Sequence, residues 1–205
     1  MNRDTDILKL IEVIHRQLGR AQTTIVTVSG PSGSGKSTVV HALQEVFPDS
    51  LLIATDDYYI GKTRMKLEMP AGHELDFDHP TAIDIDRLAG DVNQLKAGRA
   101  IDTPLYDMLR SEPRADTLRL TPRPLVIVEG IVANCPTLHR LSDMSICVTA
   151  PLEMRLARRI ERDKTRKNHT PKETKNYMLT VVEPAYTTYF AAWDQTADMI
   201  VRNDT

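Results

Sequence analysis

Cysteine, aromatic residues and net charge are scarce in this 205-residue sequence, which has two cysteines, 5% aromatic residues and a net charge of −2 at pH 7. Two cysteines cannot form a disulfide framework, so Cys135 and Cys147 are predicted to be small core residues in a reducing compartment. The small net charge argues against a general attraction to nucleic acid or to a membrane surface. The sequence also lacks a signal peptide pattern and any apolar run of the roughly 20 residues that span a bilayer. We therefore expect a soluble cytoplasmic protein.

The length suits one domain over residues 1–205, since no internal repeat or low-complexity linker divides the chain. Short apolar runs rich in β-branched residues predict five buried strands. They cover residues 23–29, 51–55, 125–128, 145–149 and 199–201. Because helical segments alternate with these strands, we expect an α/β fold with a parallel sheet covered on both faces.

Helices are predicted wherever apolar residues recur at helical spacing. They cover residues 4–18, which belong to an N-terminal helix region 1–20, and residues 39–47, 83–96, 152–163 and 171–193. Residues 60–80 lack periodicity, so we expect a long loop shaped by a ligand. Residues 100–120 contain two short β-like pieces, which predict a hairpin insertion outside the main sheet.

Residues 30–38 read Gly-Pro-Ser-Gly-Ser-Gly-Lys-Ser-Thr and match the pattern G-x-x-x-x-G-K-[ST] between a predicted strand and a predicted helix. In that setting the backbone N–H groups of a glycine-rich turn surround an anion. Lys36 adds a positive charge for the β- and γ-phosphates, and Ser37 offers a hydroxyl to Mg²⁺. The segment predicts a nucleoside triphosphate site made by Gly30, Ser32, Gly33, Ser34, Gly35, Lys36, Ser37 and Thr38.

Two carboxylates also follow directly after predicted strands, so they should meet the P-loop at the carboxyl edge of the sheet. Glu129 follows residues 125–128, where a carboxylate would hold Mg²⁺ directly or through water. Asp56 could accept the proton of an acceptor hydroxyl and also approach the metal. Asp57 could do the same, and the sequence favours Asp56 without excluding its neighbour.

Four arginines are spaced i, i+3, i+4 and i+7 on the helix predicted after Pro151: Arg155, Arg158, Arg159 and Arg162. This spacing places them on one helical face. A solvated basic face is the alternative reading. Because the chain as a whole is slightly acidic, the cluster favours a lid, about residues 152–175, that closes over the transferring phosphoryl group.

Other classes of nucleotide-binding protein fit less well. The N-K-x-D motif that GTPases use to read the base is missing. A non-catalytic module that senses ATP remains an alternative of a different class. Such a module has no need of an acceptor-activating carboxylate, so the set of Lys36, Ser37, Asp56 and Glu129 favours a small-molecule kinase.

The sequence resembles the uridine kinase / phosphoribulokinase group of P-loop kinases, and most of all uridine-cytidine kinases, over residues 23–201. The motifs are residues 30–38, Asp56-Asp57-Tyr58-Tyr59, Phe77-Asp78-His79-Pro80, Pro104-Leu105-Tyr106-Asp107, Val128-Glu129-Gly130-Ile131, residues 155–163 and Val182-Glu183-Pro184-Ala185-Tyr186. The resemblance implies a P-loop NTPase-type three-layer α/β/α fold with a five-stranded parallel sheet, a small β-hairpin insertion and a helical arginine-rich lid. It also implies ATP and Mg²⁺ as cofactors and is compatible with a homo-oligomer.

The resemblance further implies roles for individual residues. Asp56 is implied to be the catalytic aspartate that activates a sugar 5′-hydroxyl, and Asp78 to hydrogen-bond the ribose hydroxyls. Tyr106 is implied to line the nucleoside pocket. Arg155 is implied to reach the sugar, and Arg158 and Arg162 to reach phosphates. The matched motifs also place Tyr59 and His79 among the acceptor-binding residues.

Three features depart from uridine-cytidine kinases. Met108 and Ser111 stand where those kinases typically have an aromatic residue and a histidine, and Tyr177-Met178 replaces a Gln-Tyr pair. The usual final helix is missing, and the leading helix is expected to cover that face. The favoured reaction is phosphorylation of the 5′-hydroxyl of uridine or cytidine. Nicotinamide riboside, pantothenate, glycerate and a sugar phosphate remain alternative acceptors.

Overall fold

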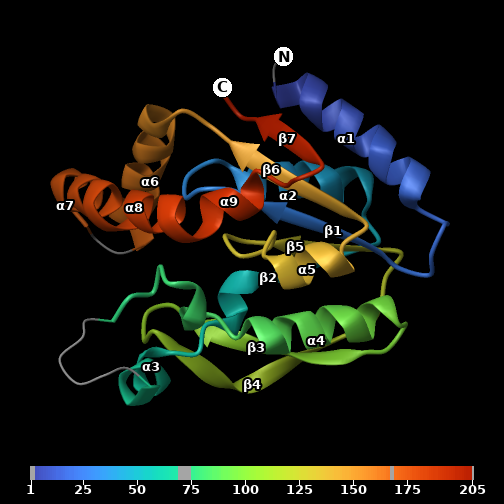
Figure 1. The fold of residues 1–205 in the computed structure, drawn as a ribbon, viewed down its shortest axis with the longest axis horizontal. Coiled ribbons are helices and arrows are strands. Elements are labelled where there is room, and N and C mark those ends of the chain that lie inside the picture. The colour runs from blue at the N-terminus through green and yellow to red at the C-terminus, as the bar shows by residue number, and fades with distance from the viewer. Residues whose placement is uncertain (1–2, 69–74, 167–168, 205) are drawn as a thin grey trace.

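A computed structural model describes residues 3–68, 75–166 and 169–204 (Figure 1). Its centre is a five-stranded sheet in the order β2-β5-β1-β6-β7, and all neighbouring strands are parallel. The strands are β1 (Thr24–Ser29), β2 (Ser50–Ala54), β5 (Leu125–Glu129), β6 (Met144–Thr149) and β7 (Met199–Arg202). All five predicted strands are thereby confirmed, each within about one or two residues of its expected bounds.

Two cores flank the sheet because successive strand residues point to opposite faces. Val26 belongs to the core beneath α1 and α2, whereas its neighbour Ile25 belongs to the core beneath α4 and α5. The helices are α1 (Arg3–Gln17), α2 (Lys36–Val46), α4 (Ile85–Lys96) and α5 (Pro136–Leu141). The three-layer α/β/α arrangement is therefore as predicted. None of the described helices is long and apolar enough to cross a membrane.

The leading helix α1 covers the sheet beside the last strand, as expected (Figure 1). Its buried residues Leu10 and Ile14 share a core with Val201 of β7. The Asp6 carboxylate accepts a hydrogen bond from the Arg202 backbone N–H at 3.2 Å. This packing supplies the cover that a helix after the last strand would provide.

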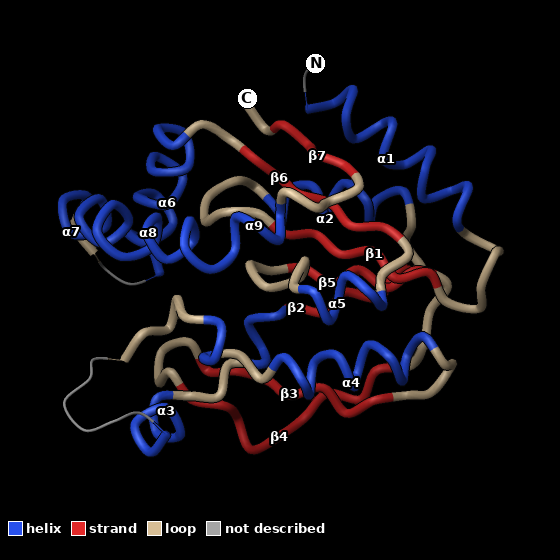
Figure 2. The backbone as a smooth tube through the Cα atoms, in the orientation of Figure 1, coloured by secondary structure: helices blue, strands red, loops and turns tan. Residues whose placement is uncertain are grey.

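The predicted hairpin is present as β3 (Ile101–Asp107) and β4 (Glu112–Leu120), paired separately from the main sheet. Figure 2 shows it with α3 (Lys62–Glu68) at the end of the molecule away from α1 and β7. The helix α3 corrects the prediction of a loop over 60–80, of which residues 69–74 lie outside the described residues. This helix has no apolar periodicity, because Met65 is its one buried residue. Its first turn is instead held by the hairpin, where the Glu112 carboxylate accepts a hydrogen bond from the Thr63 N–H at 3.0 Å.

The helix predicted over 171–193 is a continuous helical segment with two wider turns. It comprises α7 (Pro171–Tyr177), a π turn (Met178–Val182), α8 (Glu183–Ala185), a second π turn (Tyr186–Phe190) and α9 (Ala191–Asp194). Pro184 lacks an N–H donor and lies between the two π turns, which accommodate the interrupted hydrogen bonding. The preceding helix α6 (Leu152–Arg166) carries the arginines, and residues 167–168 of the expected lid lie outside the described residues.

Candidate active site

The P-loop is an open cradle that only glycine can form at three positions. Gly30, Gly33 and Gly35 have φ values of 142°, 78° and 93°, which side chains rarely adopt. A Cβ atom at Gly33 would overlap the backbone of Arg155. The buried Ser34 Oγ has no hydrogen-bond partner among the described residues. A cradle of this kind, with an unused hydroxyl, fits a bound phosphate chain.

Lys36 lies at the centre of the charged groups around the P-loop. Its ammonium donates to the carbonyl oxygens of Gly30 at 2.9 Å and Pro31 at 3.3 Å. Burial lowers the pKa of Lys36, while the carboxylates of Glu129 and Asp56 act in the opposite direction. The predicted meeting of P-loop, Asp56 and Glu129 at one edge of the sheet is therefore observed.

The register of the strands brings the two carboxylates together. Ala54 at the end of β2 pairs with Glu129 at the end of β5, and Asp56 follows in the 3₁₀ turn Thr55–Tyr58. Burial raises the pKa of Glu129; Lys36 opposes this shift, and Asp56 adds to it. The two carboxylates, with the Ser37 hydroxyl at the start of α2, offer oxygen donors of the type Mg²⁺ prefers.

A protein-only metal cage is not part of this arrangement. Within residues 3–68, 75–166 and 169–204, no group of three or more His, Cys, Asp or Glu side chains is placed to hold a metal ion. Mg²⁺ usually keeps several waters and binds through one or two carboxylates plus substrate phosphates. The donor set Ser37, Asp56 and Glu129 fits that mode, and its role as a metal site stays a prediction.

The structure distinguishes Asp57 from Asp56. The Asp57 carboxylate accepts from the Tyr106 backbone N–H at 3.3 Å, so it faces the hairpin. Burial raises the pKa of Asp57, with a smaller contribution in the same direction from Asp56. Asp56 is exposed, and its charge raises the pKa of both Lys36 and Glu129. This geometry favours Asp56 as the base.

The helix α6, predicted to act as a lid, contacts the P-loop through two of its arginines. The Arg158 guanidinium donates to the carbonyl oxygens of Gly33 and Ser34, both at 3.3 Å. The Arg159 guanidinium donates to Ser32 Oγ at 2.9 Å and is buried. The alternative of a solvated basic face is wrong for Arg159, which is 7% exposed.

Aromatic rings form a wall beside the carboxylates. The Tyr59 ring lies 5.4 Å from the Tyr106 ring and 6.0 Å from the Phe77 ring, measured between centroids. Burial raises the pKa of the Tyr59 hydroxyl, and the nearby charges of Asp56 and Asp78 raise it further. Tyr59 is therefore near two carboxylates, that of Asp56 and that of Asp78 in the Phe-Asp-His-Pro motif.

Two tyrosines of the C-terminal helical segment reach that motif. The Tyr177 hydroxyl donates to Asp78 Oδ2 at 3.0 Å, and the Tyr189 ring packs edge-on against His79 at 4.7 Å. Contacts of Phe77, Tyr177 and Tyr189 with this site were not predicted from the sequence. Tyr177 lies 99 positions from Asp78, and no local pattern predicts such a pair.

Comparison with known proteins identifies the group to which this site belongs. The profile of the Phosphoribulokinase / Uridine kinase family matches residues 25–204. The chain belongs to this family. The uridine kinase of Borrelia duttonii (strain Ly) is 32% identical over 178 residues, which are 86% of this chain and 85% of that protein.

A second uridine kinase and one solved structure are also similar to this chain. The uridine kinase of Staphylococcus epidermidis (strain ATCC 12228 / FDA PCI 1200) is 32% identical over 182 residues, 88% of this chain and 87% of that protein. The D-glycerate 3-kinase of Cryptococcus neoformans var. grubii shares the fold, with a TM-score of 0.69 at 15% identity over 96% of this chain and 95% of that chain. The chain is thus an ATP-dependent small-molecule kinase of the P-loop type.

Two residues implied in acceptor binding by this kinase have other partners in the structure. Arg155 is 7% exposed and forms a two-pronged ion pair with Glu183, at 2.5 and 2.7 Å. It therefore joins α6 to the C-terminal helical segment. The His79 Nδ1 pairs with Thr81, whose N–H donates to it at 3.2 Å at the start of the turn Pro80–Ala82. Contacts of Arg155 and His79 with an acceptor stay predictions.

The two hairpin positions that depart from uridine-cytidine kinases lie at the turn between β3 and β4. Met108 is 56% exposed. Ser111 has a φ of 55°, and its carbonyl oxygen accepts from the Lys62 N–H at 2.9 Å. The aromatic wall of this kinase therefore consists of Tyr59, Phe77 and Tyr106, and the hairpin turn contributes a bend and a contact with α3.

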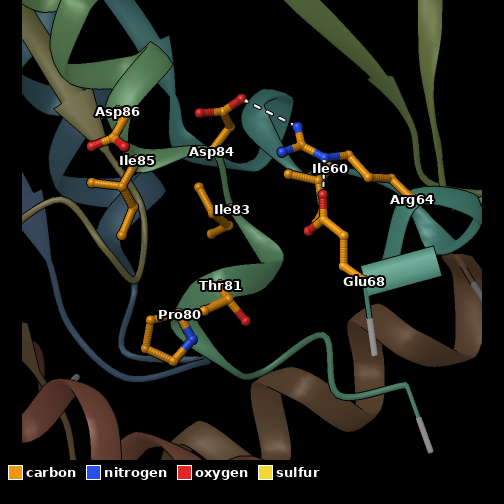
Figure 3. Close-up of a pocket in the computed structure, with 9 residues that line it drawn as sticks. All are labelled: Ile60, Arg64, Glu68, Pro80, Thr81, Ile83, Asp84, Ile85 and Asp86. Atoms are coloured by element: carbon orange, nitrogen blue, oxygen red, sulfur yellow. Dashed lines mark hydrogen bonds and ion pairs between the residues drawn. The ribbon is translucent and has the colours of Figure 1, made fainter. Parts of the chain in front are cut away.

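A separate pocket of about 270 Å³ lies between α3 and the start of α4 (Figure 3). Arg64 projects across it toward Glu68, at 2.6 Å, and toward Asp84, at 3.6 Å. Its lining includes Ile60 and Thr81 but no P-loop residue. The pocket is therefore distinct from the phosphate end of the kinase site.

Asp194 is a third acidic neighbour of Lys36, it is buried, and no sequence pattern predicted it. Asp194 of α9 accepts from Asn134 Nδ2 at 3.0 Å and from the Tyr186 hydroxyl at 2.8 Å. Burial raises its pKa, and these hydrogen bonds act against that shift. Asp194 thus joins the end of the C-terminal helical segment to the centre of the sheet.

Proposed function

We propose that this kinase transfers the γ-phosphoryl group of Mg²⁺-ATP to the 5′-hydroxyl of a ribonucleoside, uridine or cytidine, and yields the nucleoside monophosphate and ADP. The observation that supports the proposal is that two carboxylates, Asp56 and Asp78, both act electrostatically on Tyr59 of the aromatic wall, while Asp56 also acts on Lys36 of the P-loop. In this proposal Asp56 acts on the reacting hydroxyl and Asp78 binds the remaining hydroxyls. The uridine kinases among the relatives support this acceptor class.

At the phosphate end, the acceptor oxygen forms a bond to the γ-phosphorus as the bond from that phosphorus to the β,γ-bridging oxygen breaks. Asp56 takes the proton from the acceptor hydroxyl. Lys36, Arg158 and Arg162 supply positive charge toward the phosphates. When bound, Mg²⁺ neutralises phosphate charge, and Ser37, Asp56 and Glu129 are the residues that would hold it.

At the acceptor end, Asp78 supplies selectivity for a ribose. A carboxylate that accepts from two neighbouring hydroxyls loses one of these hydrogen bonds with an acceptor that lacks one hydroxyl, and a lost hydrogen bond to a charged group costs about 1.5–3 kcal/mol. Tyr59, Phe77 and Tyr106 provide apolar and aromatic surface beside it. We therefore expect both ribose hydroxyls to matter more than the identity of the pyrimidine.

The second candidate is the same chemistry on another hydroxyl compound. It is favoured by the exposed Met108 and by Ser111 in the hairpin turn, where uridine-cytidine kinases are expected to have an aromatic residue and a histidine. The acceptors to compare are nicotinamide riboside, pantothenate, glycerate and a sugar phosphate.

The test is an ADP-release assay with Mg²⁺-ATP and a panel of acceptors. The panel contains uridine, cytidine, 2′-deoxyuridine, nicotinamide riboside, pantothenate, glycerate and ribose 5-phosphate. We expect the highest kcat/KM with uridine or cytidine and a loss of at least about tenfold with 2′-deoxyuridine. Turnover of another panel member alone would replace the acceptor and retain the kinase mechanism. ATP binding without turnover of any member would favour an ATP-sensing module.

A further inference from the structure

We propose that Tyr177 is a positioning residue that couples the acceptor site to the triphosphate site, so that each substrate tightens the binding of the other. The inference rests on the proposed function, because it takes Asp78 as the carboxylate that binds the acceptor. It adds a residue and a consequence, substrate synergy, that follow from three contacts described below.

The first contact fixes the acceptor carboxylate. Tyr177 ends α7, and its hydroxyl donates to Asp78 Oδ2 at 3.0 Å. Burial and the neighbouring Asp78 raise the pKa of the Tyr177 hydroxyl, so it remains protonated and can donate at neutral pH. A carboxylate offers about four acceptor positions on its two oxygens, so Asp78 can hold Tyr177 and an acceptor hydroxyl together.

The second contact joins the same side chain to the lid. The guanidinium carbon of Arg159 lies 5.6 Å from the centre of the Tyr177 ring, within the range of a cation–π interaction. Arg159 is in turn held by Asp163, which accepts from Arg159 Nε at 3.2 Å and is 2% exposed. The position of the Tyr177 ring is therefore tied to that of Arg159.

The third contact completes the connection to the phosphates. Arg159 Nη1 donates to Ser32 Oγ at 2.9 Å, and Ser32 belongs to the P-loop. The sequence of contacts is thus Asp78, Tyr177, Arg159 and Ser32. A triphosphate in the P-loop and a ribose on Asp78 would stabilise the same arrangement of these side chains, and such coupling is reciprocal for the two ligands.

A role for Tyr177 in core packing alone explains these contacts less well. Tyr177 is 39% exposed, so little apolar burial depends on it. Both its functional parts are engaged, the hydroxyl with a carboxylate and the ring with a guanidinium. Thr180 is the control, because it is an exposed residue of the same helical segment whose hydroxyl donates to the Asn176 carbonyl oxygen at 2.8 Å.

The first experiment separates hydroxyl from ring. The dissociation constant of AMP-PNP is measured by calorimetry with and without saturating uridine, in the wild type and in Tyr177→Phe, Tyr177→Leu and Thr180→Val. We expect uridine to tighten AMP-PNP about tenfold in the wild type and in Thr180→Val. Tyr177→Phe should keep the affinity for AMP-PNP alone and lose most of the tightening. Tyr177→Leu should also weaken AMP-PNP alone, by about threefold.

The second experiment is a double-mutant cycle with Asp78→Asn, read as the KM for uridine. Tyr177→Phe should raise this KM about fivefold in the wild type and have little further effect beside Asp78→Asn. An equal rise in both backgrounds, or uridine-dependent tightening retained in Tyr177→Phe, would overturn the inference. If Asp78→Asn leaves the KM for uridine unchanged, the proposed acceptor site itself is wrong. Circular dichroism confirms that each variant is folded.

Discussion

The phosphate end and the acceptor end of this kinase are built in different ways. The phosphate end consists of segments that leave the carboxyl edge of adjacent parallel strands, so the sheet register fixes Lys36, Asp56 and Glu129 relative to one another. The acceptor end consists of a turn, a hairpin and a helix that lie outside the sheet. Its contacts join distant residues, such as Asp57 with Tyr106 and Asp78 with Tyr177.

This difference explains how one family can keep its chemistry and change its substrate. A substitution in the sheet-bound end shifts groups that must act on the phosphates together, whereas the acceptor segments can change without moving the sheet. The four predictions below test how far the two ends are independent, from the largest expected effect to the smallest.

The largest difference is expected between two adjacent carboxylates, one at each end. Asp56→Asn should lower kcat by about 10²- to 10⁴-fold, because the amide cannot take the acceptor proton, and leave AMP-PNP binding intact. Asp57→Asn keeps an oxygen for the Tyr106 N–H, so its kcat should stay close to that of the wild type. Steady-state kinetics on both variants decides the assignment. A large loss of kcat in Asp57→Asn alone would reverse it.

The P-loop cradle should be broken by a single methyl group. Gly33→Ala forces a Cβ into the backbone of Arg155 and should lower kcat/KM for ATP by about 10²-fold. Gly19→Ala is the matched control, since Gly19 has a similar φ of 84° with no atom within 4 Å of the added Cβ. It should cost about 1–2 kcal/mol of stability and leave ATP kinetics unchanged. Equal ATP kinetics in the two variants would contradict the cradle.

The buried Glu129 carboxylate is expected to destabilise the ligand-free protein. Because burial raises its pKa above the ordinary value, the folded protein retains a proton that the unfolded chain loses, and stability falls as pH rises through that interval. Glu129→Gln should therefore raise the Tm of the ligand-free protein at pH 7, while Mg²⁺-dependent kcat falls. The gain in Tm should shrink as the solution is acidified and Glu129 takes up its proton. A Tm gain that grows on acidification would refute this account.

The smallest effect is expected at the hairpin turn. Ser111 has a φ of 55°, a conformation that strains a residue with a side chain. Ser111→Gly relieves this strain but also costs conformational entropy on folding, so the net stabilisation should be about 0.5 kcal/mol. Ser142→Gly should instead destabilise it, because Ser142 has a φ of −71° that favours no glycine. Chemical denaturation measures both changes. A marked change in the KM for ATP in Ser111→Gly would show that the hairpin turn also influences the phosphate end.

The phosphate end could be predicted from the sequence because its signals are local. The P-loop lies between a β-branched run and a helix, and Glu129 directly follows an apolar strand, so topology alone brings them together. The helix α3 could not be predicted, since Met65 is its one buried residue. The four arginines share one helical face by spacing, yet only packing reveals that Arg155 holds Glu183 while Arg159 holds Ser32. Pairs such as Asp78 with Tyr177 depend on tertiary structure in the same way.

The packing of α1 against β7 also has a consequence for the order in which the chain is synthesised and folds. The contact between Asp6 and Arg202 joins residues 196 positions apart, so α1 is synthesised long before its partner strand exists. Until then Leu10 and Ile14 have no β7 against which to bury, and exposed apolar surface of this kind invites chaperones and self-association. Completion of this core therefore requires that the chain has been synthesised through β7.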